Sequence, residues 1–222
     1  MNREQVRRRI VEVGIVPVVR AASPKEALLG ADAVCAGGVP IVEVTMTVPG
    51  ALEVIAQLAS RMGEDVLIGA GTVTDVETAR RCLDAGAQFI VSPALDEQTV
   101  AYVSGKSKVM MPGALTPTEV LAAWKSGADF VKVFPCGTVG GASYIKALRG
   151  PFPEIPMIPT GGVNLNTAAD FLRAGAKSLG IGSELVSPEA LKAGDCAAIT
   201  KLTRRFKEIV KETREAANTA AK

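Results

Sequence analysis

The sequence predicts an α/β fold, namely a (β/α)8 TIM barrel with an extra N-terminal helix, formed by residues 1–222 as a single domain. Short apolar segments alternate with capped helical segments, which is the pattern of a parallel sheet covered by helices. A helix-ending glycine recurs in four similar segments, each before an even-numbered strand, and this repeat supports a count of eight strands. No Gly-x-Gly-x-x-Gly turn follows the first strand, so a doubly wound open sheet is the less favoured alternative.

The repeated segments place a glycine between a helix and the next apolar strand. Each of these glycines is expected to end its helix in the left-handed conformation. In the first segment, which has two adjacent glycines, Gly37 is the one expected to end the helix. The segments are Ala36-Gly37-Gly38-Val39, Ala85-Gly86-Ala87-Gln88, Ser126-Gly127-Ala128-Asp129 and Ala174-Gly175-Ala176-Lys177.

The strands are predicted as short runs of apolar and β-branched residues between turn residues. In chain order they are Ile15–Val19, Ile41–Thr45, Val66–Ala70, Phe89–Ser92, Val109–Met111, the run Asp129–Pro135 that contains Lys132, Met157–Pro159 and Leu179–Ile181.

The helices are predicted from amphipathic spacing and from capping residues. Asn2–Val13 is the extra leading helix, which ends at Gly14, and the final helix begins after Ala193, ends near Thr213 and leaves Ala216–Lys222 as a frayed tail. Capping boxes are predicted at Ser23-Pro24-Lys25-Glu26, Thr74-Asp75-Val76-Glu77 and Thr116-Pro117-Thr118-Glu119, and further helices at Pro49–Arg61, at Asp96–Ser104 and up to Arg149.

The overall composition excludes several classes of function. The chain has 25 Lys and Arg against 23 Asp and Glu, a net charge of +2, so a strong electrostatic footprint for nucleic acid or for an anionic membrane is not expected. The amino-terminal residues Met1–Gln5 lead into a charged helix rather than an apolar signal segment, and no run is long enough to span a membrane. The expected location is the cytoplasm.

Histidine is absent from the chain, which restricts the chemistry that it can perform. Ser-His and Cys-His nucleophiles, histidine general bases and nearly all catalytic zinc sites are excluded. The four cysteines form no C-x-x-C pair, and Cys136, close to Lys132, has no histidine to activate it as a nucleophile. The chemistry must therefore use lysine, carboxylate, hydroxyl or backbone groups, and no metal or cofactor is expected.

Lys132 stands in the middle of an apolar strand. Phe130 and Phe134 are expected on its face of the strand, where they would exclude water. Burial can lower the pKa of a lysine and free a nucleophilic amine near neutral pH, although a lysine on an edge strand can also extend its ammonium to water. Lys132 is therefore a candidate nucleophile.

Glu43 is a carboxylate within the apolar run Ile41–Thr45, at a position similar to that of Lys132 in its own strand. Because alternate strands of a barrel contribute to the same interior layer, the two side chains are expected to meet across the interior. A buried ion pair without catalysis is the alternative, but the position of both residues near the carboxyl ends of strands favours function.

Two glycine turns follow the last two strands, where barrels of this kind often bind phosphate. Backbone amides in such turns can approach an anion closely, so Thr160-Gly161-Gly162 and Gly182-Ser183 are candidate phosphate-binding segments. Ordinary loop geometry is the alternative. The other polar residues expected at this end are Arg20, Thr45, Thr47, Thr72 and Ser92, of which Arg20, Thr47 and Thr72 are candidate substrate-binding residues.

A set of motifs in a fixed order resembles the class I 2-keto-3-deoxy-6-phosphogluconate (KDPG) / 4-hydroxy-2-oxoglutarate (KHG) aldolase family. The resemblance covers nearly the whole chain. The motifs are Glu43-Val44-Thr45, Gly69-Ala70-Gly71-Thr72-Val73, Phe89-Ile90-Val91-Ser92-Pro93, Met111-Pro112-Gly113, Lys132-Val133-Phe134-Pro135, Gly150-Pro151-Phe152, Pro159-Thr160-Gly161-Gly162 and Gly182-Ser183-Glu184-Leu185-Val186.

This resemblance implies a Schiff-base aldolase that releases pyruvate from an oxo acid, with no cofactor and as a homotrimer. It implies that Lys132 forms the imine and that Glu43 is the general acid and base, in part through water. It also implies that Thr72 holds the pyruvate carboxylate and that Pro93 and Phe134 line the pocket. The distal phosphate would contact Thr160, Gly161, Gly162, Gly182 and Ser183.

One departure concerns anion binding. Many relatives have Thr-Leu-Arg-Thr after the glutamate and valine, whereas this chain has Thr45-Met46-Thr47-Val48 and therefore lacks that arginine. Arg20 resembles the arginine of another branch and is the expected replacement. Two other functions remain open: a metal-free phosphosugar isomerase or epimerase, and a noncatalytic ligand-binding or assembly protein.

Overall fold

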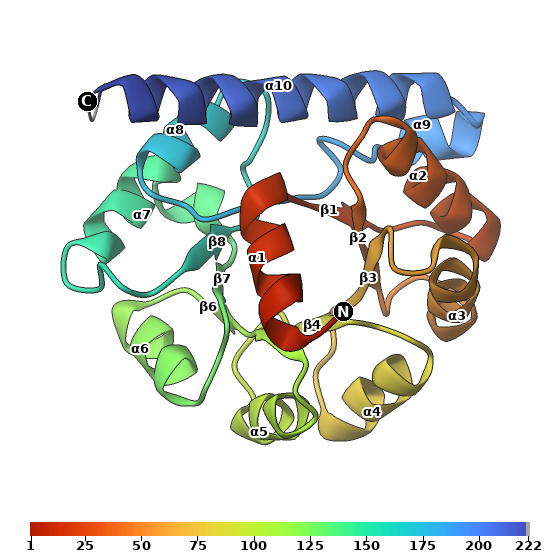
Figure 1. Ribbon diagram of the computed structural model, residues 1–222, viewed down its shortest axis with the longest axis horizontal. Helices are drawn as coiled ribbons and strands as arrows, with labels where there is room; N and C mark the ends of the chain where they lie inside the picture. Colours follow the sequence, from red (N-terminus) through yellow and green to blue (C-terminus); the bar gives the residue numbers. More distant parts are fainter. Residues whose placement is uncertain (221–222) are drawn as a thin grey trace.

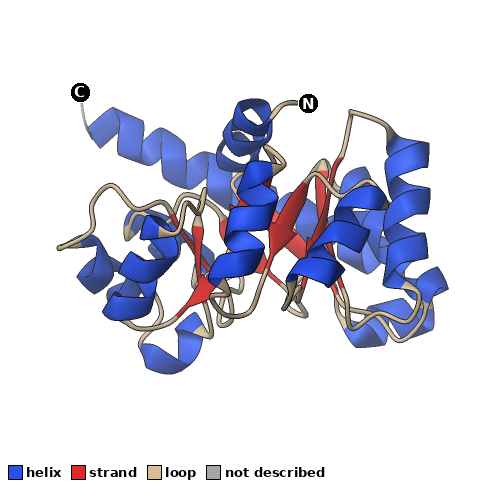
Figure 2. Cartoon of the chain, turned by 90° about the horizontal axis from the view of Figure 1, so that it is seen from below, coloured by secondary structure: helices blue, strands red, loops and turns tan. Residues whose placement is uncertain are grey.

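The computed structural model describes residues 1–220, in which short parallel strands form the centre and helices surround them (Figures 1 and 2). The six-stranded sheet has the order β5-β4-β3-β2-β1-β9 and the three-stranded sheet the order β6-β7-β8. The strands are β1 Ile15–Val19, β2 Ile41–Thr45, β3 Leu67–Gly71, β4 Phe89–Val91, β5 Val109–Met111, β6 Gly113–Ala114, β7 Val131–Val133, β8 Met157–Pro159 and β9 Leu179–Ile181.

The two sheets curl so that their edges meet at two seams. At one seam, the backbone N–H of Asp129 donates to the carbonyl of Met110, and that of Lys132 donates to Pro112. At the other seam, Thr160 forms an isolated parallel bridge with Gly180. Each run predicted as a strand overlaps an observed strand, although β3 begins and ends one residue later than predicted and β6 was not predicted. The α/β class with a parallel sheet is confirmed.

Most helices cover the outside of the strands and bury an apolar stripe against them. The helices are α1 Arg3–Val13, α2 Pro24–Ala36, α3 Ala51–Met62, α4 Val76–Asp84, α5 Glu97–Gly105, α6 Pro117–Lys125, α7 Ala142–Arg149, α8 Ala168–Arg173, α9 Pro188–Ala193 and α10 Cys196–Ala220, with a 3-10 turn, η1, at Cys136–Val139. Helix α10 instead packs on the helices α2, α8 and α9. None of these helices, within residues 1–220, has the length and apolar composition needed to cross a lipid bilayer.

Of the three predicted capping boxes, one is complete. Thr116 accepts from the N–H of Glu119 and the Glu119 side chain accepts from Thr116, as predicted. At α2 only half of the capping box forms. The Ser23 hydroxyl accepts from the backbone N–H of Glu26, whereas the Glu26 carboxylate accepts from the N–H of Ala22 instead of that of Ser23.

The prediction that Thr74 starts α4 was wrong. The cap is Asp75, whose carboxylate accepts from the backbone N–H of Thr78.

The left-handed glycine of the first repeat is Gly38, not Gly37 as the sequence suggested. Gly38 has φ +85°, close to +102°, +99° and +97° at Gly86, Gly127 and Gly175, whereas Gly37 is right-handed. In each repeat the left-handed residue comes after the C-cap, and the C-cap of α2 is Gly37 itself.

The final helix begins after Ala193 as predicted but runs to Ala220, beyond the expected end at Thr213. Arg214 explains the extension, because its guanidinium donates to the carbonyls of Glu12 and Val11 at the end of α1. The predicted frayed tail therefore begins within a helix, and its last two positions, 221–222, lie outside the described residues. Helix α8 is the helix that the glycine of the fourth repeat was expected to end, whereas the short helix α9 has no counterpart in the prediction from sequence.

The extra N-terminal helix is confirmed, and α1 lies in front of the strands at one end (Figure 1). Its Arg3 side chain donates to both carboxylate oxygens of Asp129, at 2.9 Å from Nε to Oδ1 and 2.9 Å from Nη2 to Oδ2. The buried Asp129 carboxylate also accepts from the backbone N–H of Met110. This group therefore ties α1 to the segment just before β7.

We predict that Arg3→Ala lowers the free energy of unfolding by about 2 kcal/mol, because it removes the principal charged partner of a buried carboxylate. Urea denaturation of the variant and the wild type measures the difference. Arg8→Ala is the control, since the exposed Arg8 forms an ion pair with the exposed Glu12 at 3.5 Å and its removal should have little effect. Equal losses in both variants would contradict a specific role for Arg3.

Candidate active site

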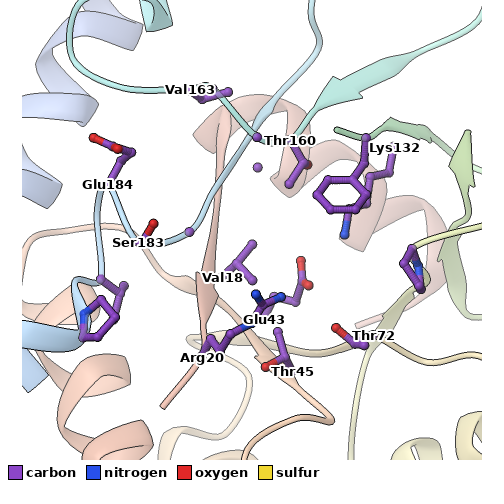
Figure 3. Close-up of a pocket in the computed structure, with 18 residues that line it drawn as sticks. Val18, Arg20, Glu43, Thr45, Thr72, Lys132, Thr160, Val163, Ser183 and Glu184 are labelled. Carbon is purple, nitrogen blue, oxygen red and sulfur yellow. The ribbon is translucent and has the colours of Figure 1, made fainter. Parts of the chain in front are cut away.

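A cavity of about 360 Å³ opens at the carboxyl ends of the strands (Figure 3). It gathers residues that lie far apart in the sequence, which is the arrangement expected of parallel strands that end at one face. The predicted site residues that line it are Arg20, Glu43, Thr72, Pro93, Lys132, Phe134, Thr160, Gly161, Gly162, Gly182 and Ser183. Thr47 is the only predicted site residue outside this lining.

Lys132 projects into the cavity from the middle of β7. Its backbone is fixed by pairing with Gly113 of β6 and Ile158 of β8. The residue is 8% exposed, and Nζ lies 5.1 Å from the centroid of the Phe134 ring, within the range of a cation–π contact. Among residues 1–220, Nζ has no hydrogen-bond or ion-pair partner, so the amine is available to a ligand.

The two phenylalanines beside Lys132 have different surroundings. Phe130 is fully buried, as expected, but Phe134 is 37% exposed. Phe134 therefore forms an outer wall of the cavity. The expectation from sequence that Phe134 would exclude water from Lys132 was wrong. The difference arises because β7 ends at Val133, so Phe134 lies at the rim of the strand layer.

Glu43 faces Lys132 from β2 across the cavity (Figure 3). The side chain is 3% exposed, and its Oε1 atom is buried without a hydrogen-bond partner in the described residues, 1–220. Burial raises the pKa of the Glu43 carboxyl, and the positive charges of Lys132 and Arg20 oppose this increase. A carboxyl with a raised pKa retains its proton at higher pH than an ordinary glutamate and is suited to proton transfer.

The alternative of a buried ion pair is not what the geometry shows. Within residues 1–220, the ion pairs with N–O distances up to 4.0 Å do not include Lys132 with Glu43. The Lys132 charge acts on the Glu43 carboxyl, and both side chains line the same cavity. A small ligand can therefore occupy the region between amine and carboxyl.

Arg20 enters the cavity from the residue that follows β1 (Figure 3). The buried Thr45 hydroxyl contacts the carbonyl of Val19, the residue before Arg20, at 3.3 Å. Thr47 is exposed and reaches the site only indirectly, through a 2.8 Å hydrogen bond with the Thr45 hydroxyl. Thr45 thus braces the peptide unit that carries Arg20.

Thr72 follows β3 with its backbone in the left-handed region, at φ +59°. This conformation is rare for a β-branched residue and is found most often at functional sites. Thr72 lines the cavity on the side of Glu43 (Figure 3).

The glycine turns after β8 and β9 form the other end of the cavity. Gly161 and Gly162 both have positive φ, at +84° and +80°, and their N–H groups donate to no backbone carbonyl in the loops of residues 1–220. Gly162 also packs directly against the backbone of Gly137, where a Cβ would lie 2.6 Å from the Gly137 Cα. The turns therefore present backbone amides on a surface without side chains, which suits an anion.

Cys136 lies near this end but does not take part as a nucleophile. Burial raises the pKa of its thiol to about 11, so the thiolate is scarce at neutral pH. Its Sγ contacts the carbonyl of Gly141 at 3.5 Å.

Seven lining residues were not among the predicted site residues. Thr45 was expected near this end without a role, and Val18 is next to Glu43 in the β1–β2 register, so pairing of the strands would have identified it. Of the other five, one lies within β9 and four lie in the segments that follow β8 and β9. Whether those four reach the cavity depends on the paths of these segments, which the sequence pattern does not specify. The seven are Val18, Thr45, Val163, Gly180, Glu184, Val186 and Pro188.

Comparison with known proteins gives a consistent result. The protein-family model described as KDPG and KHG aldolase matches residues 6–202. The chain is 35% identical over 198 residues to the 2-dehydro-3-deoxy-phosphogluconate aldolase of Treponema pallidum, covering 89% of this chain and 94% of that protein. It is 34% identical over 194 residues to the KHG/KDPG aldolase of Escherichia coli K12, covering 87% and 91%.

A solved structure shares both the fold and part of the sequence. The KDPG aldolase of Legionella pneumophila, with pyruvate captured as a covalent carbinolamine intermediate, aligns with a TM-score of 0.82 and 30% identity. The alignment covers 89% of this chain and 96% of that protein.

We predict that Glu43→Gln becomes progressively more stable than the wild type as the pH rises. The folded wild type binds its proton more tightly than the unfolded chain, so its stability falls from about pH 4.5 upward, by at most about 1.4 kcal/mol per pH unit, until the raised pKa is passed. The glutamine variant has no such loss. Urea denaturation between about pH 4.5 and pH 8 measures the divergence, with the exposed Glu189→Gln as control.

Parallel stability curves for Glu43→Gln and the wild type would contradict a raised pKa at Glu43.

Proposed function

Since the chain belongs to the KDPG and KHG aldolase family, we propose that it is a class I aldolase in which Lys132 forms a Schiff base with the substrate. The substrates are 2-keto-3-deoxy-6-phosphogluconate, which gives pyruvate and glyceraldehyde 3-phosphate, and 4-hydroxy-2-oxoglutarate, which gives pyruvate and glyoxylate. The observation that carries this proposal is the unpartnered Lys132 amine facing a buried carboxyl within one cavity.

The reaction begins when the neutral Lys132 amine attacks the C2 ketone of the oxo acid and forms a carbinolamine. Loss of water gives an iminium ion. Glu43 removes the proton from the C4 hydroxyl, in part through water, and the C3–C4 bond breaks as its electrons move toward the iminium nitrogen. The aldehyde leaves, and the resulting enamine takes a proton at C3. Hydrolysis of this second iminium ion releases pyruvate and restores the lysine.

The remaining residues bind the two ends of the substrate. Arg20 and Thr72 hold the carboxylate that adjoins the ketone, and Thr47 acts indirectly through Thr45. Pro93 and Phe134 bound the pocket beside the imine. The distal group, a phosphate in the sugar acid, contacts the cradle formed by Thr160, Gly161, Gly162, Gly182 and Ser183.

The fold in this proposal is a closed (β/α)8 TIM barrel within residues 1–222, with the extra helix α1 at one end. The hydrogen bonds at both seams support closure, and β5 and β6 count as two halves of one barrel strand interrupted at Pro112. One core extends beneath both sheets, which supports a single domain.

The protein in this proposal is a cytoplasmic homotrimer. All four cysteines are free, which suits a reducing compartment. The side chains of Phe134 and Val139 are partly exposed near the cavity, and assembly of subunits would cover apolar surface of this kind.

We predict that borohydride reduction in the presence of pyruvate attaches a reduced pyruvyl group at Lys132. Peptide mass spectrometry locates the modification. Lys132→Met should lose the label and more than about 10³-fold of kcat, whereas Lys146→Arg, at an exposed lysine of α7, should retain both. Substrate cleavage without any label would refute the Schiff-base mechanism, and an isomerase or a noncatalytic protein would give neither label nor pyruvate.

We predict that Arg20→Ala raises KM for 4-hydroxy-2-oxoglutarate about 10- to 100-fold with a smaller effect on kcat, because a charge-assisted contact with a carboxylate is lost. Steady-state assays of pyruvate release measure both constants. Arg20→Lys retains the charge and should show a smaller increase. An unchanged KM in Arg20→Ala would remove Arg20 from the carboxylate site.

A further inference from the structure

Strand β3 carries two glycines, Gly69 and Gly71, on the same face, because alternate residues of a strand point the same way. Gly69 is in register with Glu43 of β2 on one side and with Phe89 of β4 on the other. A Cβ at Gly69 would collide with the Phe89 ring. The larger side chains of both neighbouring strands therefore lean over a strip of β3 that has no side chains.

The Glu43 carboxyl occupies this strip above Gly71. A Cβ at Gly71 would collide with Oε1 of Glu43 and would lie 2.6 Å from its Cδ and 2.8 Å from its Cγ. These distances are far shorter than a real carbon contact, so Glu43 as placed is compatible only with glycine at this position.

The carboxyl is held in this position by shape more than by hydrogen bonds. Oε1 is completely buried, and it has no hydrogen-bond partner among residues 1–220. Buried carboxyl oxygens normally accept hydrogen bonds that fix their orientation. The recess above Gly71 therefore fixes the orientation of Oε1 in place of hydrogen bonds.

We propose that Gly71 is a positioning residue for Glu43, because its missing side chain provides the recess that directs the carboxyl toward the cavity and Lys132. The effect of Gly71 on catalysis rests on the proposed aldolase function. Its effect on the position of the Glu43 carboxyl is independent of that function. A methyl group at residue 71 displaces the carboxyl from the recess, and a displacement of about 1 Å in a catalytic group can reduce the rate about 10²-fold.

The first test compares Gly71→Ala with Gly105→Ala, whose added methyl group meets nothing within 4 Å. We expect Gly71→Ala to lower kcat about 10- to 100-fold while pyruvate still labels Lys132 on borohydride reduction, and Gly105→Ala to leave both unchanged. A Gly71→Ala enzyme with wild-type kcat would overturn the proposal.

The second test asks whether the effect operates through Glu43. Glu43→Ala removes Oε1, Cδ and Cγ, the three atoms that a methyl group at residue 71 would meet. The loss of residual pyruvate release caused by Gly71→Ala should therefore be several-fold smaller in the Glu43→Ala background than in the wild type. Equal losses in both backgrounds would overturn the proposal.

The same pair of variants covers a failure to fold. If Gly71→Ala alone does not fold but the double variant with Glu43→Ala does, the collision is with the glutamate, as proposed. If neither folds, glycine is required by the strand itself and the proposal fails.

A titration without substrate separates this inference from the aldolase function. The infrared difference between each protein and its Glu43→Gln counterpart reports the carboxyl of Glu43 directly. In Gly71→Ala, its pKa should move from the raised wild-type value toward that of an ordinary glutamate, because the carboxyl leaves its buried recess. An unchanged pKa would overturn the role of Gly71, whereas absence of pyruvate labelling in the wild type would refute only the aldolase.

Discussion

The burial of two ionisable groups, Lys132 and Glu43, inside an otherwise apolar strand layer is the constraint on which the rest of the site depends. Removing a carboxyl from water raises its pKa, and the part of the chain that the structure describes offers Oε1 of Glu43 no hydrogen bond in compensation. The lysine and arginine that face it oppose this effect only in part. The fold accommodates this cost because the strands that carry the two residues are fixed on both sides by parallel pairing.

Glycine creates the room that these polar groups need. The inward face of β3 has no side chains at Gly69 and Gly71, so Phe89 and Glu43 share the space above it. A similar relation recurs at Gly180, where a Cβ would collide with the Thr160 hydroxyl. Several glycines of the site are therefore explained by their neighbours in space and not by turns, and their substitution acts on catalytic or binding groups of another strand.

The order of strands and helices could be predicted because each depends on local patterns, such as apolar runs and the capping residues Asp96 and Thr116. The gathering of Lys132, Glu43 and the glycine turns also followed, since the carboxyl ends of parallel strands meet at one face. Tertiary contacts decided the rest. The end of α10 depends on Arg214 reaching α1, and the exposure of Phe134 depends on where β7 stops, so neither can be inferred from its own segment.

The two ends of the cavity present different kinds of attraction to a ligand, and this difference bears on selectivity. One end has the full charge of Arg20, which acts at a distance on any carboxylate. The other has the turns at Gly161, Gly162 and Gly182, whose backbone amides act only on a group that fits closely against them. On the proposed assignment, charge selects the oxo-acid end that all substrates share, whereas the shape of the turns selects among the aldehyde ends in which substrates differ.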